Sequence, residues 1–160
     1  MSEEVKDYIN NVLSEKREEF NGKAVCPFAA PELAANKIMF ATIGDKSLVE
    51  LINEFRNSDY ESAVFLVKEE VTAEETKKFQ IFVNRVLRQE GLVGYKNICF
   101  NPNDKVSVDG YNPRSLAPHF LINIAHSKVL SKGHRALMKT DYYDKLPDDY
   151  LKFLSVEKDK

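Results

Sequence analysis

The spacing of hydrophobic residues predicts several helices along the chain. Apolar residues recur at helical spacing between positions 5 and 13, which predicts an amphipathic helix from Ser2 to about Phe20, ended by Asn21-Gly22. A second helix follows Gly44, with Asp45 as its expected N-cap. The buried stripe of this second helix comprises Leu48, Leu51, Ile52 and Phe55.

A third helix carries the clearest start signal. Thr72 and Glu75 have the spacing of a capping box, in which each side chain bonds the other residue's free backbone N–H. The helix is expected to end at Gly91, and its apolar stripe comprises Phe79, Phe82, Val83, Val86 and Leu87. Ser127 is the expected cap of a fourth helix through about Met138, and a short helix is expected after Leu146.

Four apolar segments predict strands, at residues 37–43, 62–67, 97–100 and 118–126. Strands and helices alternate up to Phe100, which favours right-handed crossovers and parallel strands. A long loop rich in Asn, Asp, Gly and Pro runs from Asn101 to Pro113 and could return the last strand antiparallel. We therefore expect one α/β domain over residues 1–160, with a central mixed or mostly parallel sheet of about four strands flanked by helices.

Composition and charge narrow the class of protein. The 160 residues are 43% hydrophobic and 30% charged, with a formal net charge of -2, which is typical of a soluble globular domain without an affinity for nucleic acid or anionic membranes. The sequence has no apolar run of membrane-spanning length, and its first residues are acidic where a secretory signal is basic and then apolar. A cytoplasmic location is expected.

Cys26 is the main candidate for chemistry. The chain has two cysteines, Cys26 and Cys99, without the spacing of a zinc cluster or a disulfide framework. Pro27 pushes Cys26 out of the helical region and removes the next backbone N–H, so the thiol is expected at a chain reversal. Such a thiol suits an axial ligand to haem iron, a nucleophilic or redox cysteine, or a small buried hydrophobe.

The segments Val25-Cys26-Pro27-Phe28-Ala29, Phe100-Asn101-Pro102 and Ala117-Pro118-His119-Phe120 carry a resemblance that covers most of the chain in order and spacing. The chain resembles a bacterial family of unknown function that has a Leu-Cys-Pro-Phe-Ala motif, a Phe-His-Pro motif after a strand and a late Ser-Pro-aromatic-Pro strand. More distantly, it is similar to YcgG-like proteins, some of which are haem-dependent N-oxygenases acting on amino acids or guanidines. These proteins carry a proline-cysteine motif after their first helix.

The resemblance implies a haem pocket. Cys26 would be the metal ligand, with Pro27, Phe28 and Phe100 beside the macrocycle. Asn101 stands where the family has histidine, and His119 takes the aromatic position of the late motif, so either could handle bound oxygen or substrate.

Other polar residues have weaker signals. Arg114 either holds a substrate carboxylate through a bidentate contact or is simply exposed. Three of its loop neighbours, Asp109, Tyr111 and Asn112, are further candidates for a pocket lining. His126 could cap a helix or hydrogen-bond a ligand-holding residue, and it should face away from His119 if the strand is regular. Either His119 or His126 is an alternative to Cys26 as the axial ligand. His134 lies in a polar context typical of the surface.

Two functional hypotheses follow. The first is a small haem-thiolate oxidoreductase, an oxygenase acting on an amine or an amino-acid-like substrate, with a homodimer that shares the pocket as one arrangement. The second is a domain without haem that binds a small molecule or a protein and has a structural or redox-active Cys26. Phosphate-binding, serine-hydrolase and zinc-protease motifs are absent from the sequence.

Overall fold

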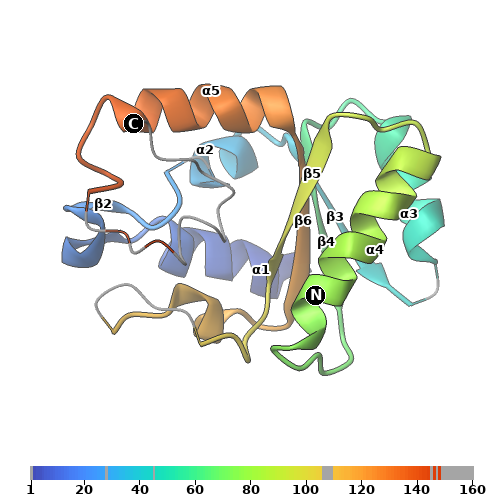
Figure 1. Cartoon of the computed structure of the whole chain (residues 1–160), viewed down its shortest axis with the longest axis horizontal. Coiled ribbons are helices and arrows are strands. Elements are labelled where there is room, and N and C mark those ends of the chain that lie inside the picture. The colour runs from blue at the N-terminus through green and yellow to red at the C-terminus, as the bar shows by residue number, and fades with distance from the viewer. Residues whose placement is uncertain are drawn as a thin grey trace.

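A four-stranded mixed sheet separates two helical layers (Figure 1). The structure, a computed structural model, describes residues 2–27, 29–44, 46–105, 110–144, 146 and 148. The strands are β3 (Ile38–Ile43), β4 (Ser62–Val67), β5 (Tyr95–Phe100) and β6 (Phe120–His126), with β1 (Lys16–Arg17) and β2 (Lys23–Ala24) in a separate small hairpin. The α-helices are α1 (Ser2–Tyr8), α2 (Ala29–Ala34), α3 (Leu48–Arg56), α4 (Glu75–Gln89) and α5 (Ser127–Met138).

The strand order β3-β4-β6-β5 confirms the mixed sheet. β3 and β4 run parallel, joined by α3, whereas β6 lies antiparallel to both β4 and β5. The connection from β5 to β6 contains a short 3-10 helix, η3 (Pro113–Leu116). Because this connection does not cross to the other end of the sheet, it returns the chain antiparallel.

Alternating side chains of the strands serve two different cores. On one face, Phe65 and Ile122 are completely buried against the apolar stripes of α3 and α4. On the other face, Leu66 and Leu121 pack towards α1 and the residues that follow it. Figure 1 shows α3 and α4 on one side of the sheet and α1, α2 and α5 on the other.

Capping-box hydrogen bonds lie at the N-terminal ends of α3 and α4, the two helices that share one side of the sheet. The backbone N–H of Glu75 donates to Thr72 Oγ1 at 3.3 Å and that of Thr72 donates to Glu75 Oε1 at 3.0 Å, which confirms the predicted box. Hydrogen bonds to the Glu75 carboxylate from the Thr72 backbone N–H and, secondarily, the Thr72 hydroxyl lower the pKa of Glu75. In α3 the N-cap is Ser47 and not the predicted Asp45, and Ser47 exchanges equivalent bonds with Glu50. The predicted stripe of α3 is buried as expected.

The predicted first helix is wrong in its second half. α1 ends at Tyr8 and continues as one π-helical segment, η1 (Ile9–Leu13), after which the chain forms the β1–β2 hairpin. The helical stripe has no apolar member between Leu13 and Phe20, so a longer helix would bury nothing more. Asn21-Gly22 does end a helix, but a short 3-10 helix, η2 (Glu18–Phe20), whose C-cap is Asn21. Both residues have positive φ, 57° and 78°, and they lead the chain from η2 into β2 of the hairpin.

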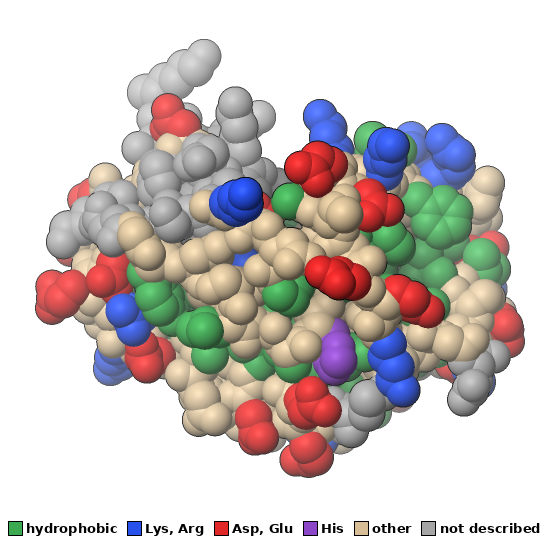
Figure 2. Space-filling view, turned by 90° about the horizontal axis from the view of Figure 1, so that it is seen from below, with side chains coloured by type: hydrophobic (Ala, Val, Ile, Leu, Met, Phe, Trp, Pro, Cys, Tyr) green, Lys and Arg blue, Asp and Glu red, His purple; other side chains and the backbone are tan. Residues whose placement is uncertain are grey.

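Two further details differ from the sequence prediction. Phe82 was expected in the buried stripe of α4 but is 49% exposed, beside Ile81 at 51%. Figure 2 shows hydrophobic side chains gathered at the side of the molecule where α3 and α4 lie, with acidic and basic side chains interspersed over the rest of that view. The N-cap of α5 is His126, not Ser127, because His126 Nδ1 accepts the Lys128 N–H at 3.0 Å.

Some predictions fall on residues outside the described ranges. These are the Asp45 cap, Phe28 and Asp109, the side chain of His134, and the short helix expected after Leu146. Within the described part of the chain, no helix has the length and apolar character needed to cross a membrane.

Candidate functional site

The main feature of the structure is an apolar cavity of about 420 Å³ between the sheet and the α1–α2–α5 layer. Its lining from the sheet comprises Ile38, Ser62, Val64, Phe100, Leu121, Asn123 and Ala125. Its lining from the helices includes Val5, Tyr8, Ile9, Leu13, Ala29 and Leu130. A volume of this size is in the range that holds a small organic ligand.

Exposed lining residues mark the opening of the cavity. Pro31 of α2 and both Lys132 and Ala136 of α5 line it and are also exposed to solvent. Ser62 and Leu121 lie on its inner wall and are buried. The cavity therefore reaches from an opening between α2 and α5 down to the middle of the sheet.

The π-helical segment η1 forms part of the cavity wall. Ile9 and Leu13, its first and last residues, are both buried and both line the cavity. A π-helical turn widens the helix by one residue, and such turns are frequent at functional sites. The widened turn places these two apolar side chains against the ligand space.

Cys26 lies in the cavity wall at the chain reversal that Pro27 predicts. Its backbone N–H donates to the Leu13 carbonyl at 2.7 Å, which ties the cysteine segment to the end of η1. The Tyr142 hydroxyl donates to the Val25 carbonyl just before it. The thiol is partly buried and lines the cavity. Burial, and secondarily the charge that Cys26 can carry, raise the pKa of Tyr143 to about 12.

The second thiol lies across the sheet. Cys99 of β5 is completely buried in the core formed with α3 and α4, and its Sγ donates to Asn97 Oδ1 at 3.4 Å. Burial raises the pKa of the Cys99 thiol to about 12, so it stays protonated and unreactive at neutral pH. Because the sheet separates Cys99 from Cys26, the two cannot form an intramolecular disulfide in this fold.

Three polar residues line the half of the cavity that runs from the middle of the sheet to the start of β4. Ser62 Oγ donates to Glu32 Oε2 at 3.2 Å, which links α2 to the start of β4. Asn123 lies in the middle of β6, next to Val64, and its side chain forms no hydrogen bond with any described residue. Burial raises the pKa of Glu32, and the nearby Glu61 adds to this rise. A half-buried carboxyl and an amide without a hydrogen-bond partner among the described residues thus face a mostly apolar space.

The structure brings two of the predicted cofactor residues together. Cys26 and Phe100 both line the cavity although they are far apart in the sequence. Pro27 is outside the lining, where it shapes the backbone at Cys26.

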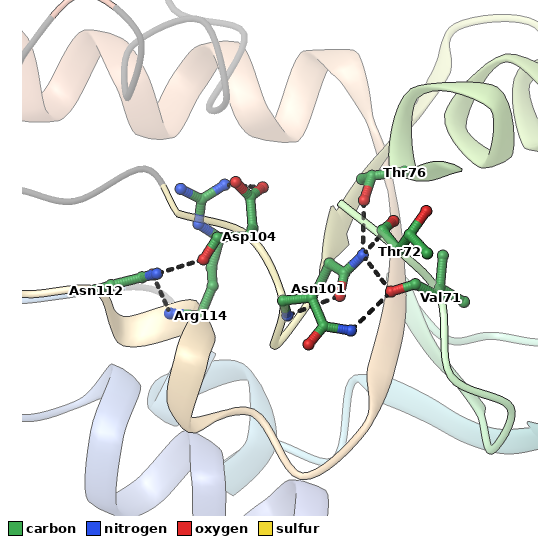
Figure 3. Close-up of polar contacts among 8 residues, drawn as sticks. Val71, Thr72, Thr76, Asn101, Asp104, Asn112 and Arg114 are labelled. Carbon is green, nitrogen blue, oxygen red and sulfur yellow. Dashed lines mark hydrogen bonds and ion pairs between the residues drawn. The ribbon is translucent and has the colours of Figure 1, made fainter. Parts of the chain in front are cut away.

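Asn101 is placed outside the cavity in a dense hydrogen-bond network (Figure 3). Its amide nitrogen donates to the carbonyls of Val71 and Thr72, each at 3.0 Å, and to Thr76 Oγ1 at 2.8 Å. Its Oδ1 accepts the Asn103 N–H at 2.9 Å. This completely buried side chain joins the end of β5 to the start of α4, and these bonds occupy its polar atoms.

Arg114 is buried rather than exposed, with only 1% of its side chain accessible. Its Nη1 lies 2.6 Å from Asp104 Oδ2, and Asn112 closes the loop by accepting the Arg114 N–H and donating to the Asp104 carbonyl (Figure 3). Tyr111, another predicted lining residue, packs its ring 3.6 Å from the Arg17 guanidinium. These contacts hold the long loop together.

The described histidines also lie outside the cavity lining. His119 Nε2 is 3.4 Å from Glu4 Oε2 on α1, whereas His126 stacks edge-on against Tyr95 in the opposite core. The expectation that they face opposite sides is confirmed. No group of three or more His, Cys, Asp or Glu side chains among the described residues is arranged to hold a metal ion.

No protein-family model, curated protein or solved structure matches the chain. The site therefore has to be interpreted from its own geometry.

Sequence reasoning missed the polar end of the cavity. Asn123 interrupts the otherwise apolar run of β6, and a polar residue in the middle of a buried strand is a signal that could have been used. Glu32 and Ser62 have no such signal, because their meeting depends on how α2 packs over the sheet.

Proposed function

We propose that this domain binds a small, largely apolar organic molecule in the cavity, with Cys26 in contact with the ligand. The main support for this proposal is that Cys26, the residue that the sequence marks for chemistry, lines an apolar cavity of about 420 Å³. A well-formed apolar cavity with a few converging polar groups is the usual form of a ligand site.

Haem is a second candidate ligand, favoured by the placement of Cys26 and Phe100 in one cavity. Cys26 would supply a thiolate ligand to the iron, aliphatic side chains and Phe100 would surround the group, and Lys132 would lie at the opening. When bound, haem would supply the redox chemistry of an oxygenase acting on an amine or an amino-acid-like substrate. His119, Asn101 and Arg114 keep their predicted catalytic roles as hypotheses, and all three lie outside the described lining.

A fluorescence titration with N-phenyl-1-naphthylamine, a small apolar dye that brightens in apolar surroundings, tests the proposal. We expect saturable binding of about one dye per chain with a Kd at or below about 10 µM, as enclosed apolar sites of this kind allow. The absence of saturable binding by protein that remains folded would refute the proposed function.

An absorption spectrum of protein produced with a haem precursor decides between the two candidates. A Soret band at stoichiometric haem that is lost in Cys26→Ser would support the haem-thiolate enzyme. Colourless protein that binds the dye but not added haem would leave the haem-free binding domain.

A further inference from the structure

Glu32 has no positively charged partner of its own among the described residues. Its carboxyl accepts one hydrogen bond, from Ser62, and forms no ion pair within the described part of the chain. The neighbouring Lys37, whose charge acts on Glu32, has its Nζ 3.3 Å from Glu61 Oε1 and is thus paired with another carboxylate. Lys132 is exposed at the opening of the cavity, on α5. Glu32 is thus a half-buried carboxyl at a ligand cavity without a bound cation.

The polar and apolar ends of the cavity lie along the strands. The register pairs Ser62 with Ala125 at one end and Leu121 with Phe100 at the other. Ser62 and Leu66, which pairs with Leu121, are four residues apart, and four residues span about 13 Å of strand. Asn123 lies between the two ends. A ligand lying along the strands would have its head at Glu32 and its tail against Phe100.

We infer that the cavity takes a hydrophobic primary amine, whose ammonium group donates hydrogen bonds to Glu32 and whose chain or ring lies against the apolar wall. This inference rests on the proposed function and assigns Glu32, Ser62 and Asn123 as the head-group site. An ammonium group beside Glu32 would form charge-assisted hydrogen bonds with its carboxylate. The side-chain oxygen Oδ1 of Asn123 would accept a further hydrogen bond. A carboxylate at the same position would face like charge.

The test compares three ligands that differ only in the head group: octylamine, octanol and octanoate. Each displaces the bound dye at pH 7.5 from the unaltered protein and from the variants Glu32→Gln and Glu54→Gln. We expect octylamine to bind at least about tenfold more tightly than octanol, as one charge-assisted hydrogen bond allows. Glu32→Gln should abolish this preference, whereas Glu54→Gln, a matched change at an exposed carboxylate of α3 on the other side of the sheet, should keep it.

Acidity gives an independent readout. The preference for octylamine over octanol should fall as the pH is lowered through the raised pKa of Glu32, because the protonated carboxyl no longer attracts an ammonium group. The surrounding charged groups, Lys37, Glu61 and Lys132, are unaltered in the Glu32→Gln comparison.

The outcomes separate the two proposals. Dye binding combined with equal affinities for the three head groups, or with tightest binding of octanoate, would overturn the amine assignment while leaving the ligand cavity in place. An amine preference that survives Glu32→Gln would also overturn it. Failure of every ligand and of the dye would refute both proposals.

Discussion

Val64→Phe is expected to abolish ligand binding while the protein stays folded. Val64 lies on the cavity face of β4, between Phe40 and Asn123 on the neighbouring strands. A phenylalanine ring at this position would project into the ligand space, and phenylalanine is well suited to a strand. We expect the affinity for the dye to fall at least about 100-fold, which equals about 2.7 kcal/mol.

The free energy of unfolding shows whether Val64→Phe blocks the cavity or disrupts the fold. The new ring enters empty space, so the free energy of unfolding should change by no more than about 1 kcal/mol. Val49→Phe is the matched control, because Val49 is 43% exposed on α3, on the other side of the sheet. Equal dye affinities for the two variants would show that binding occurs outside the cavity.

Asp104→Ala is expected to give the largest loss of stability. The change removes a carboxylate that neutralises Arg114, which is 1% exposed, and leaves the guanidinium buried without this counter-charge. Breaking a buried ion pair from one side costs about 3 kcal/mol or more, since the remaining charge cannot regain its hydration. Chemical denaturation measured by circular dichroism gives the free energy of unfolding.

Two variants test the reason for this loss. Glu54→Ala removes one partner of the exposed Lys46–Glu54 pair and should cost less than about 1 kcal/mol. Combining Asp104→Ala with Arg114→Met should recover part of the lost stability, because no buried charge then remains. Equal losses for Asp104→Ala and Glu54→Ala would contradict the structural role assigned to the buried pair.

Local patterns predicted the elements whose stabilising contacts are close in the sequence. Thr72 and Glu75 form the expected capping box, and Leu51 and Ile52 lie in the expected buried stripe of α3. The hairpin after Leu13 was missed, because Asn21-Gly22 can end a long α-helix or, as here, a single 3-10 turn inside a hairpin loop. The choice depends on where Phe20 is buried, which is a tertiary contact.

The candidate site was predicted in part. Cys26 and Phe100 were expected together from the family resemblance, and both line the cavity. Asn101 and Arg114 are polar residues in a long loop, which is also typical of binding sites, but both are buried in contacts that hold the loop. Only the packing of distant segments distinguishes these two cases.

Alkylation of Cys26 by iodoacetamide, with and without the dye, tests most directly whether the ligand binds against this thiol. In the folded protein we expect Cys26 to react and Cys99 to remain unmodified, as peptide mass spectrometry can show, because Cys99 is completely buried. The account predicts that the dye slows Cys26 alkylation in proportion to occupancy, with half-protection at the dye's Kd, and that Val64→Phe removes this protection. An unchanged rate of Cys26 alkylation at saturating dye would contradict the account.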